Sequence, residues 1–286
     1  MFKRLLLFLV ILSSISFGKA PQRAVSASQF TTEILLAIGA EEQVAGTAFM
    51  DNEILPELKE KYEKIPVLSS KYPSKEVFYS VNPDFVTGWK SLSMPNNLGS
   101  VEELNENGVE VFFMKSLESN NIDDVFDDIL EFGRIFDKEN NAQKIVASMK
   151  NELEQIKEKL PKEKATVLPY DGGESAPFVV GGGGIGNTII ELAGGENIFK
   201  DIRGSFGNGT WEKVLMADPE IILIIDYGDN TVDKKIEYLK EKSPIKDIDA
   251  VKNEKFAVIR LGDISAGIRN INAVKKLAKE FHNVEI

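Results

Sequence analysis

The chain has 286 residues, of which 43% are hydrophobic and 28% are charged, and its formal net charge at pH 7 is −11. These proportions are those of a soluble globular protein, and the length is sufficient for two domain-sized cores. They exclude a disordered chain and a membrane protein with several spans, and the acidic charge argues against nucleic acid as a partner.

The first twenty residues have the features of a cleavable signal peptide. Lys3 and Arg4 form a basic start, the run from Leu5 to Leu12 is too short to span a bilayer, and Gly18-Lys19-Ala20 is a small-x-small cleavage site. Cleavage after Ala20 removes three basic residues and lowers the formal charge from −11 to −14. We expect a periplasmic protein. Free secretion and an N-terminal membrane anchor are the alternatives.

Helices and strands alternate over residues 21–120, which predicts a lobe with a parallel sheet. Ser28 and Ser74 are placed to cap helices, and Gly39 is placed to end one. The expected strands cover residues 24–27, 43–47, 65–68, 85–87 and 109–113. The expected helices cover residues 30–38, 55–62, 75–81 and 101–107.

The next segment, from Lys138 to Leu160, contains neither Pro nor Gly and places apolar residues at spacings of three and four. This pattern predicts one amphipathic helix of about six turns, twice the usual length. We assign residues 121–163 to a helical linker. Residues 164–286 return to the alternation, with expected strands at 165–168, 178–180, 221–225 and 256–259, and expected helices at 188–193, 211–216, 232–242 and 272–282.

The segments on the two sides of the long helix resemble each other. Thr32–Glu41 matches Asn187–Glu196, with Gly39 aligned to Gly194. At a helix-to-strand junction in each half, Asn82-Pro83-Asp84 matches Asp218-Pro219-Glu220. The sequence therefore predicts an α/β fold with two Rossmann-like lobes that carry parallel sheets and are joined by a single long helix. A cleft between the lobes is the expected ligand site.

The glycine-rich run Gly181–Gly186 contains the spacing of a dinucleotide-binding loop. Its position in the second lobe, and the absence of a second strand before Asp201, favour a different role. We expect the loop to let the backbone approach a ligand in the cleft. Carboxylate pairs are too frequent in an acidic chain to identify a glycosidase.

Zero cysteines and a single histidine, His282, exclude disulfides and cysteine-held metals and disfavour both a bare transition-metal site and a Ser-His-Asp hydrolase. We therefore expect no intrinsic metal or cofactor and no catalytic residues. Aromatic side chains in loops that follow strands are natural walls for a flat ligand, and cations there would suit an anionic one. Core packing and surface charge are the alternatives. The candidate ligand-binding residues are Ser28, Phe49, Trp89, Lys90, Tyr170, Arg203, Phe206, Tyr227 and Arg269.

With these residues laid out, the whole mature chain resembles the class III periplasmic substrate-binding proteins of ABC importers, which bind vitamin B12, siderophores and haem. The matching segments are Val25 to Gly46, Asn82-Pro83-Asp84, Lys138 to Leu160, Leu192 to Ile198, Trp211 to Leu215 with Asp218-Pro219, and Gly267-Ile268-Arg269.

The resemblance implies two lobes on one helix, a rigid cleft, and docking to a membrane permease through one acidic residue on each lobe. The positions that match are Glu57 and Glu212. We therefore expect a monomeric, non-enzymatic carrier that delivers a ferric siderophore, haem or cobalamin to an ABC permease and its ATPase. It would touch the membrane only through the permease and have no lipid anchor. The alternatives are a secreted enzyme acting on an anionic substrate and a scavenging protein without a permease.

Overall fold

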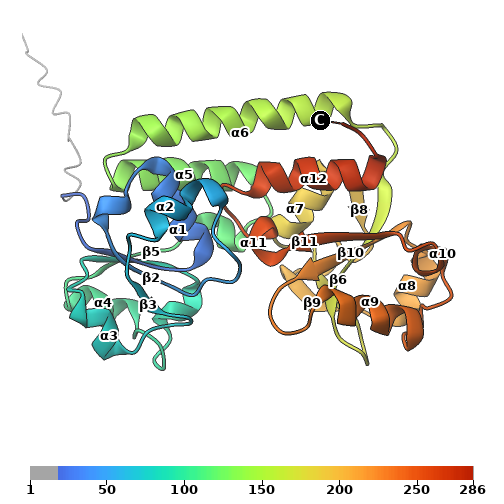
Figure 1. The fold of residues 1–286 in the computed structure, drawn as a ribbon, viewed down its shortest axis with the longest axis horizontal. Coiled ribbons are helices and arrows are strands. Elements are labelled where there is room, and N and C mark those ends of the chain that lie inside the picture. Colours follow the sequence, from blue (N-terminus) through green and yellow to red (C-terminus); the bar gives the residue numbers. More distant parts are fainter. Residues whose placement is uncertain (1–18, 286) are drawn as a thin grey trace, which may run out of the picture.

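The computed structural model describes residues 19–285, so all but the end of the expected signal peptide, residues 1–20, lies outside the described residues. Two α/β lobes, each built on its own sheet, lie below a long helix that runs across both (Figure 1). This arrangement confirms the predicted two-lobed fold. None of the helices within residues 19–285 is both long and apolar enough to cross a membrane.

The first lobe contains a five-stranded sheet in the order β3-β2-β1-β4-β5, and every pairing in it is parallel, as predicted. Its strands are β1 (Ala24–Ala27), β2 (Val44–Ala48), β3 (Val67–Ser69), β4 (Phe85–Gly88) and β5 (Glu110–Phe112). Its helices are α1 (Gln29–Ile38), α2 (Lys59–Tyr62), α3 (Lys75–Ser80) and α4 (Val101–Glu106). Short 3-10 turns connect several of them, including η2 (Pro56–Leu58) and η4 (Lys115–Glu118).

The second lobe contains a sheet in the order β11-β10-β6-β7-β9, with β8 paired to β6. Its strands are β6 (Ala165–Gly172), β7 (Phe178–Val180), β8 (Gly195–Asn197), β9 (Phe206–Asn208), β10 (Ile221–Asp226) and β11 (Phe256–Arg260). Its helices are α7 (Ile185–Leu192), α8 (Trp211–Ala217), α9 (Val232–Glu241), α10 (Asp249–Lys252), α11 (Leu261–Ile264) and α12 (Asn270–His282).

This second sheet is mostly parallel, but β7 and β9 run antiparallel to their neighbours, which the sequence did not predict. The short loop after β6 reverses the chain at Gly173, which has a left-handed φ of 85°. A side chain there would meet the carbonyl of Ala176 at 2.2 Å. The tight reversal makes β6 and β7 a hairpin, and hairpin strands are antiparallel.

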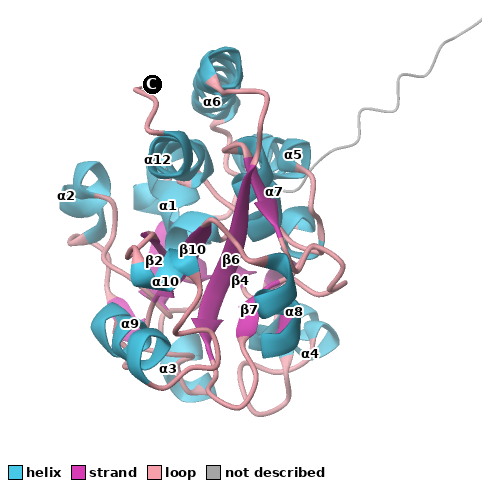
Figure 2. Cartoon of the chain, turned by 90° about the vertical axis from the view of Figure 1, so that its right-hand side faces the viewer, coloured by secondary structure: helices cyan, strands magenta, loops and turns pink. Residues whose placement is uncertain are grey.

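Two helices, α5 (Ile122–Ile135) and α6 (Glu139–Lys159), connect the lobes. The predicted long helix agrees with α6 to within one residue at each end, whereas α5 was not predicted as a separate helix. Helix α6 packs against α1 and α5 on one side and α12 on the other. In Figure 2 it forms the outermost layer, above α5 and α12.

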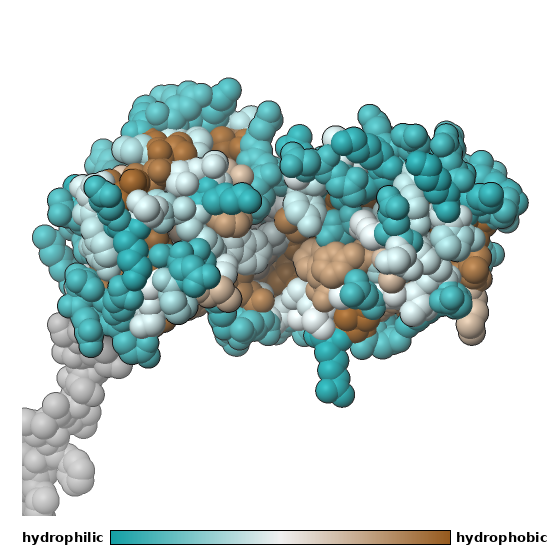
Figure 3. Space-filling view, turned by 90° about the horizontal axis from the view of Figure 1, so that it is seen from below, coloured by the Kyte–Doolittle hydropathy of each residue, from teal (hydrophilic) through white to brown (hydrophobic). Residues whose placement is uncertain are grey.

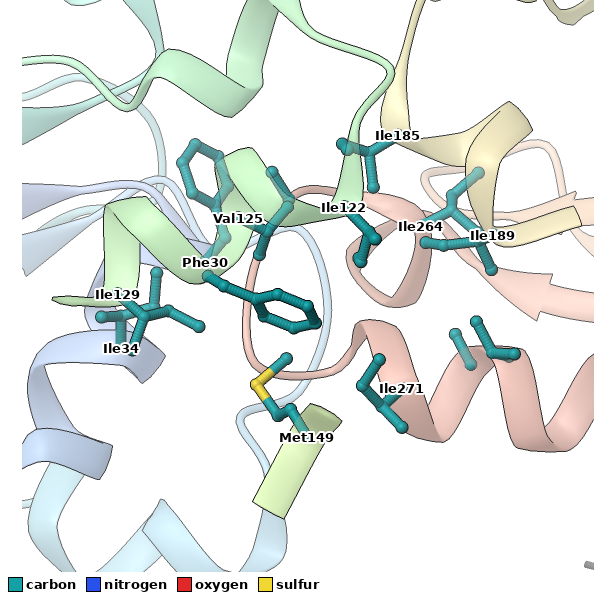
Figure 4. Packing of buried hydrophobic residues seen from close by; sticks show 14 of the residues in the cluster. Phe30, Ile34, Ile122, Val125, Ile129, Met149, Ile185, Ile189, Ile264 and Ile271 are labelled. Carbon is teal, nitrogen blue, oxygen red and sulfur yellow. The ribbon is translucent and has the colours of Figure 1, made fainter. Parts of the chain in front are cut away.

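Successive residues of each central strand pack into different cores, because side chains alternate across a sheet. In β10, Leu223 and Ile225 join a core that faces α6, whereas Ile222 and Ile224 join one that lies under α8, α9 and α10. The core facing α6 is continuous between the lobes and contains residues of α1, α5, α6, α7, α11 and α12 (Figure 4). Opening the lobes widely would expose this shared apolar surface, so the fold resists a large hinge motion.

Candidate ligand-binding cleft

A cavity of about 230 Å³ lies between the lobes, at the carboxyl ends of strands from both sheets. Trp89 follows β4 of the first lobe, Phe206 begins β9 of the second, and Leu261 follows β11. The complete lining is Trp89, Ser116, Leu117, Ile185, Gly186, Ser205, Phe206, Leu261, Ile264, Ser265 and Ala266. Figure 3 shows the hollow between the lobes, with apolar residues at its base and on its wall.

Two of the predicted aromatic residues therefore face the same cavity from opposite lobes. Trp89 packs edge-on against Phe30, with ring centroids 4.7 Å apart, which fixes its orientation. Phe206 stacks on Phe178 at 6.0 Å, with an interplanar angle of 15°. The cleft thus presents two supported aromatic faces, which suits a ligand with flat or apolar surfaces.

A second cavity of about 240 Å³ adjoins this pair, because Phe178 lines it while Phe206 lines the first. It lies at the carboxyl ends of β6 and β10 and contains Asp171, Tyr227 and Lys235. Figure 1 shows the loops of these strands on the side of the lobe away from α6. Its lining contains charged residues, whereas the lining of the first cavity contains none, and we call it the polar cavity.

Two of its charged residues, Asp171 and Lys235, are buried. The Lys235 ammonium lies 3.4 Å from one oxygen of Asp171 and donates to the carbonyl of Ile225 at 2.6 Å. The Tyr227 hydroxyl donates to the other Asp171 oxygen at 3.4 Å. Burial raises the pKa of Asp171, and Lys235 and Tyr227 oppose that rise. Burial also raises the pKa of Tyr227, to which Asp171 and Asp51 add, so a carboxylate of the first lobe acts on this side of the cleft.

A larger cavity, of about 520 Å³, lies elsewhere. It opens at the amino ends of β6, β10 and β11, and its lining comes entirely from the second lobe. Ligands of open α/β sheets bind at the carboxyl ends of the strands. We therefore take the smaller cavity between the lobes, and not the larger one, as the candidate site.

Three of the predicted ligand-binding residues are buried and occupied by structural contacts. Ser28 is 0% exposed and caps α1 through the amide of Thr31. Tyr170 is 2% exposed and donates its hydroxyl proton to the carbonyl of Gly173. Arg269 is 5% exposed. None of the three belongs to the lining of either cavity.

Arg269 joins the two lobes. Its guanidinium forms two hydrogen bonds, of 2.5 and 2.7 Å, with the carboxylate of Glu33 in α1, and a third of 3.0 Å with Asp263. It also donates to the carbonyl of Glu53 at 2.7 Å. Burial alone would lower the pKa of Arg269, but the two carboxylates raise it. Arg269, which we expected to bind the ligand, thus connects the two lobes.

The other predicted residues lie nearer the surface. Lys90 is exposed and pairs with Glu118 at 2.5 Å. Arg203 is exposed and is absent from the lining of both cavities. Phe49 has a left-handed φ of 60° and packs against Tyr72 at 4.7 Å. Among residues 19–285, no three His, Asp or Glu side chains come together as a metal-binding group.

The glycine-rich loop has a structural role that differs from the expected one. The amides of Gly181, Gly182 and Gly183 donate to backbone carbonyls of the segment 202–205. A side chain at Gly182 or Gly183 would approach a carbonyl oxygen to 1.9 or 1.8 Å. The glycines therefore allow two backbone segments to touch, and these three amides are not free for a ligand.

The proposed docking residues are both exposed. Glu57 lies in η2, whose Leu58 packs in the core facing α6. Glu212 lies in the first turn of α8, on the opposite side of its sheet. The equivalent helix of the first lobe is α3, which ends before Asn82-Pro83 as α8 ends before Asp218-Pro219.

This correspondence adds a candidate that the sequence analysis did not name. Glu76 and Glu212 occupy the same position after their capping residues, Ser74 and Thr210. Helices α3 and α8 both cover the sheet face away from α6, because Phe78 and Trp211 belong to the cores on that side. The matching junctions in the sequence were the signal that could have pointed to Glu76.

Comparison with known proteins gives the same fold and a family. A family model described as periplasmic binding protein matches residues 25–261. A solved periplasmic binding protein from Veillonella parvula is 34% identical, with a TM-score of 0.89 and 94% coverage of both chains.

More distant relatives carry more specific names. The vitamin B12-binding protein of Vibrio campbellii is 24% identical over 216 residues, which is 74% of each chain. The structure of an ABC-type Fe3+-hydroxamate transport system protein from Saccharomonospora viridis is 21% identical, with a TM-score of 0.77 and coverage of 93% and 95%. The family match spans most of the chain and both lobes, and the protein belongs to the periplasmic binding protein family.

Proposed function

We propose that this protein is the periplasmic substrate-binding component of an ABC importer and that it carries a metal chelate, such as a ferric siderophore, haem or cobalamin. The observation that carries the proposal is the cavity walled by Trp89 from one lobe and Phe206 from the other. At about 230 Å³ it is smaller than a typical small-molecule pocket of roughly 300–1,000 Å³. A chelate would fill it with one edge and extend through the open mouth.

In this proposal Trp89, Phe206 and Tyr227 contact the ligand, with Phe49, Lys90 and Arg203 at the rim. The chelator itself supplies the ligands of the metal, which fits a cleft lined by aromatic and apolar side chains. The names of the Vibrio campbellii and Saccharomonospora viridis relatives support a chelate as the cargo.

Ligand capture is the direct test. The protein purified from its host should contain a metal chelate in a one-to-one ratio, detected by native mass spectrometry and visible absorbance. Added chelate should quench the fluorescence of Trp89 in a Trp211→Phe background, in which Trp89 is the remaining tryptophan. If neither the host nor a panel of ferric siderophores, haem and cyanocobalamin supplies a ligand, the proposal is wrong.

Delivery requires a surface that reaches a permease across both lobes. Glu212 supplies one carboxylate, and the first lobe offers two candidates, Glu57 and Glu76. We favour Glu76, because α3 and α8 cover the same side of the molecule (Figure 1). Complementary charges at such a transient interface set register and association rate.

Uptake assays separate these candidates and the alternative functions. Glu212→Ala and Glu76→Ala should each lower uptake without changing chelate affinity, and Glu57→Ala should have the smaller effect. A loss with Glu57→Ala and not with Glu76→Ala would reverse our assignment. Uptake that is unchanged in all three variants would favour a scavenger without a permease, and turnover of a bound substrate would favour an enzyme.

A further inference from the structure

The two cavities beside the Phe178–Phe206 pair differ in charge. The apolar one has no charged residue in its lining, whereas the polar one contains Asp171, Asp229 and Lys235. Its only cation is thus outnumbered by carboxylates. Because the rings of Phe178 and Phe206 stack, a ligand that lies on them would reach both cavities.

Lys235 is not available to an anionic ligand. Its side chain is 1% exposed, and it is held by Asp171 and by the carbonyl of Ile225. The other cations predicted for the cleft are also paired with carboxylates or lie outside the lining of both cavities. Arg269 is bonded to Glu33 and Asp263, Lys90 is paired with Glu118, and Arg203 lines neither cavity.

Asp171, in contrast, is a buried acceptor that is incompletely satisfied. Both of its hydrogen bonds are 3.4 Å long, whereas a charge-assisted bond is about 2.7–2.9 Å. Its side chain is only 6% exposed, so water can supply few of the hydrogen bonds that the carboxylate lacks. A ligand N–H or O–H entering the cavity would supply the missing donor.

Asp51 adds a second carboxylate from the opposite lobe. Within residues 19–285 it has no hydrogen-bond or ion-pair partner, and burial raises its pKa. It lies close enough to Tyr227 and Tyr72 to raise their pKa values as well. Among the residues that line the polar cavity, the carboxylates of Asp171 and Asp229 outnumber the single cation, and Asp51 of the first lobe adds an electrostatic effect at Tyr227.

From these contacts, and on the basis of the function proposed above, we propose that the cavity around Asp171 selects the charge class of the ligand. It accepts N–H or O–H donor groups of a neutral or cationic chelate, and together with Asp51 it repels chelates that carry carboxylates or other negative charge. Phe206 and Trp89 hold the apolar body of the ligand, and Asp171 recognises its polar periphery.

The test compares the affinities of three metal chelates that differ in charge, measured by calorimetry at low salt. Cationic ferrioxamine B and neutral, amide-bearing cyanocobalamin are the favoured classes, and a trianionic ferric tris-catecholate is the disfavoured one. We expect the tightest of the favoured probes to exceed the tris-catecholate in affinity by at least about tenfold, as for a hydrogen bond to a charged group. A tris-catecholate that binds as tightly as the tighter of the two favoured probes would overturn the inference while leaving the proposed function intact. Binding of no chelate would instead refute the proposed function.

Substitutions test which residues cause the preference for one charge class of chelate. Asp171→Asn keeps the shape of the side chain but leaves the Lys235 charge uncompensated, so it should reduce the preference for the cationic over the anionic chelate by about tenfold or more. The matched control is Asp233→Asn, an exposed change of equal charge on α9, which should leave the preference unchanged.

Asp51→Asn provides an independent test of the charge preference, because this side chain has no hydrogen-bond or ion-pair partner to lose. It should shift the preference in the same direction as Asp171→Asn, by a smaller factor. If Asp51→Asn and a folded Asp171→Asn both retain the wild-type ratio of affinities, the polar cavity does not select the ligand. If Asp171→Asn does not fold, an unchanged ratio in Asp51→Asn is sufficient to overturn the inference.

Discussion

Two ion pairs within residues 19–285 have both side chains buried, and they differ in their hydrogen bonding and in their surroundings. Glu33 and Arg269 lie 2.5 Å apart between the lobes, with side chains 1% and 5% exposed, and further hydrogen bonds satisfy the guanidinium. Asp171 and Lys235 lie 3.4 Å apart inside one lobe, with exposures of 6% and 1%, and border a cavity.

The difference separates a structural contact from a recognition site. A buried charge is tolerated when its hydrogen-bonding groups have partners, as four of the five N–H donors of Arg269 do. Around Asp171 the hydrogen bonds are long, and space for another group lies beside them. Burial and charge alone therefore do not distinguish the two roles, whereas the satisfaction of the hydrogen bonds does.

The largest expected effect comes from breaking the pair between the lobes. Arg269→Met leaves Glu33 buried without its counter-charge and should lower the free energy of unfolding by about 3–5 kcal/mol. Urea denaturation measures this change in the free energy of unfolding. The control Lys157→Met removes an exposed partner of Glu154 and should cost at most about 0.5 kcal/mol. A loss below about 1 kcal/mol for Arg269→Met would mean that the pair does not hold the lobes.

An intermediate effect should come from the aromatic wall. Trp89→Ala removes one face of the apolar cavity and should weaken chelate binding at least about thirtyfold, which corresponds to about 2 kcal/mol. The comparison variant is Trp211→Phe, in the core under α8 and outside the lining of the cavity. It should leave the affinity within a factor of about two. Equal losses in both variants would show that Trp89 acts through the fold.

The smallest effect concerns pH. Because burial raises the pKa of Asp171, its protonation begins at a higher pH than that of an ordinary aspartate. Affinity for ferrioxamine B should therefore begin to fall, as the pH is lowered, at a higher pH than an ordinary aspartate would cause. Asp171→Asn should show a flatter profile. Since Asp51 also has a raised pKa, Asp51→Asn is needed to separate the two carboxylates.

The same raised pKa has the opposite sign for stability. The folded protein favours the protonated form of Asp171 more than the unfolded chain does. Its contribution to the free energy of unfolding is therefore greatest at low pH and is lost as pH rises through the folded-state pKa. As pH rises, the deprotonation of Asp171 should therefore make the free energy of unfolding smaller and the affinity for ferrioxamine B greater.

The sequence predicted what depends on nearby residues. The stripe of apolar residues located α6, and Ser28 and Ser74 cap the helices that they were expected to cap. The matching halves predicted two lobes. It did not predict α5 or the antiparallel β7 and β9, which depend on packing and on the reversal at Gly173.

The cleft was harder to predict, because partners far apart in the chain decide which charges are free. Arg269 was expected at the ligand, but Glu33, its partner, is 236 positions away. Lys235 was overlooked although it shares the apolar face of α9 with Leu239. A lysine on such a face is the one local signal that could have indicated the polar cavity.

A crystal structure of the protein with bound chelate tests the central claim most directly. We predict that the chelate lies between Trp89 and Phe206 with its polar groups at Asp171, that the Glu33–Arg269 contact persists, and that the lobes shift by no more than about 1 Å. A chelate bound outside this cleft, or lobes that rotate apart and break the Glu33–Arg269 contact, would contradict the account.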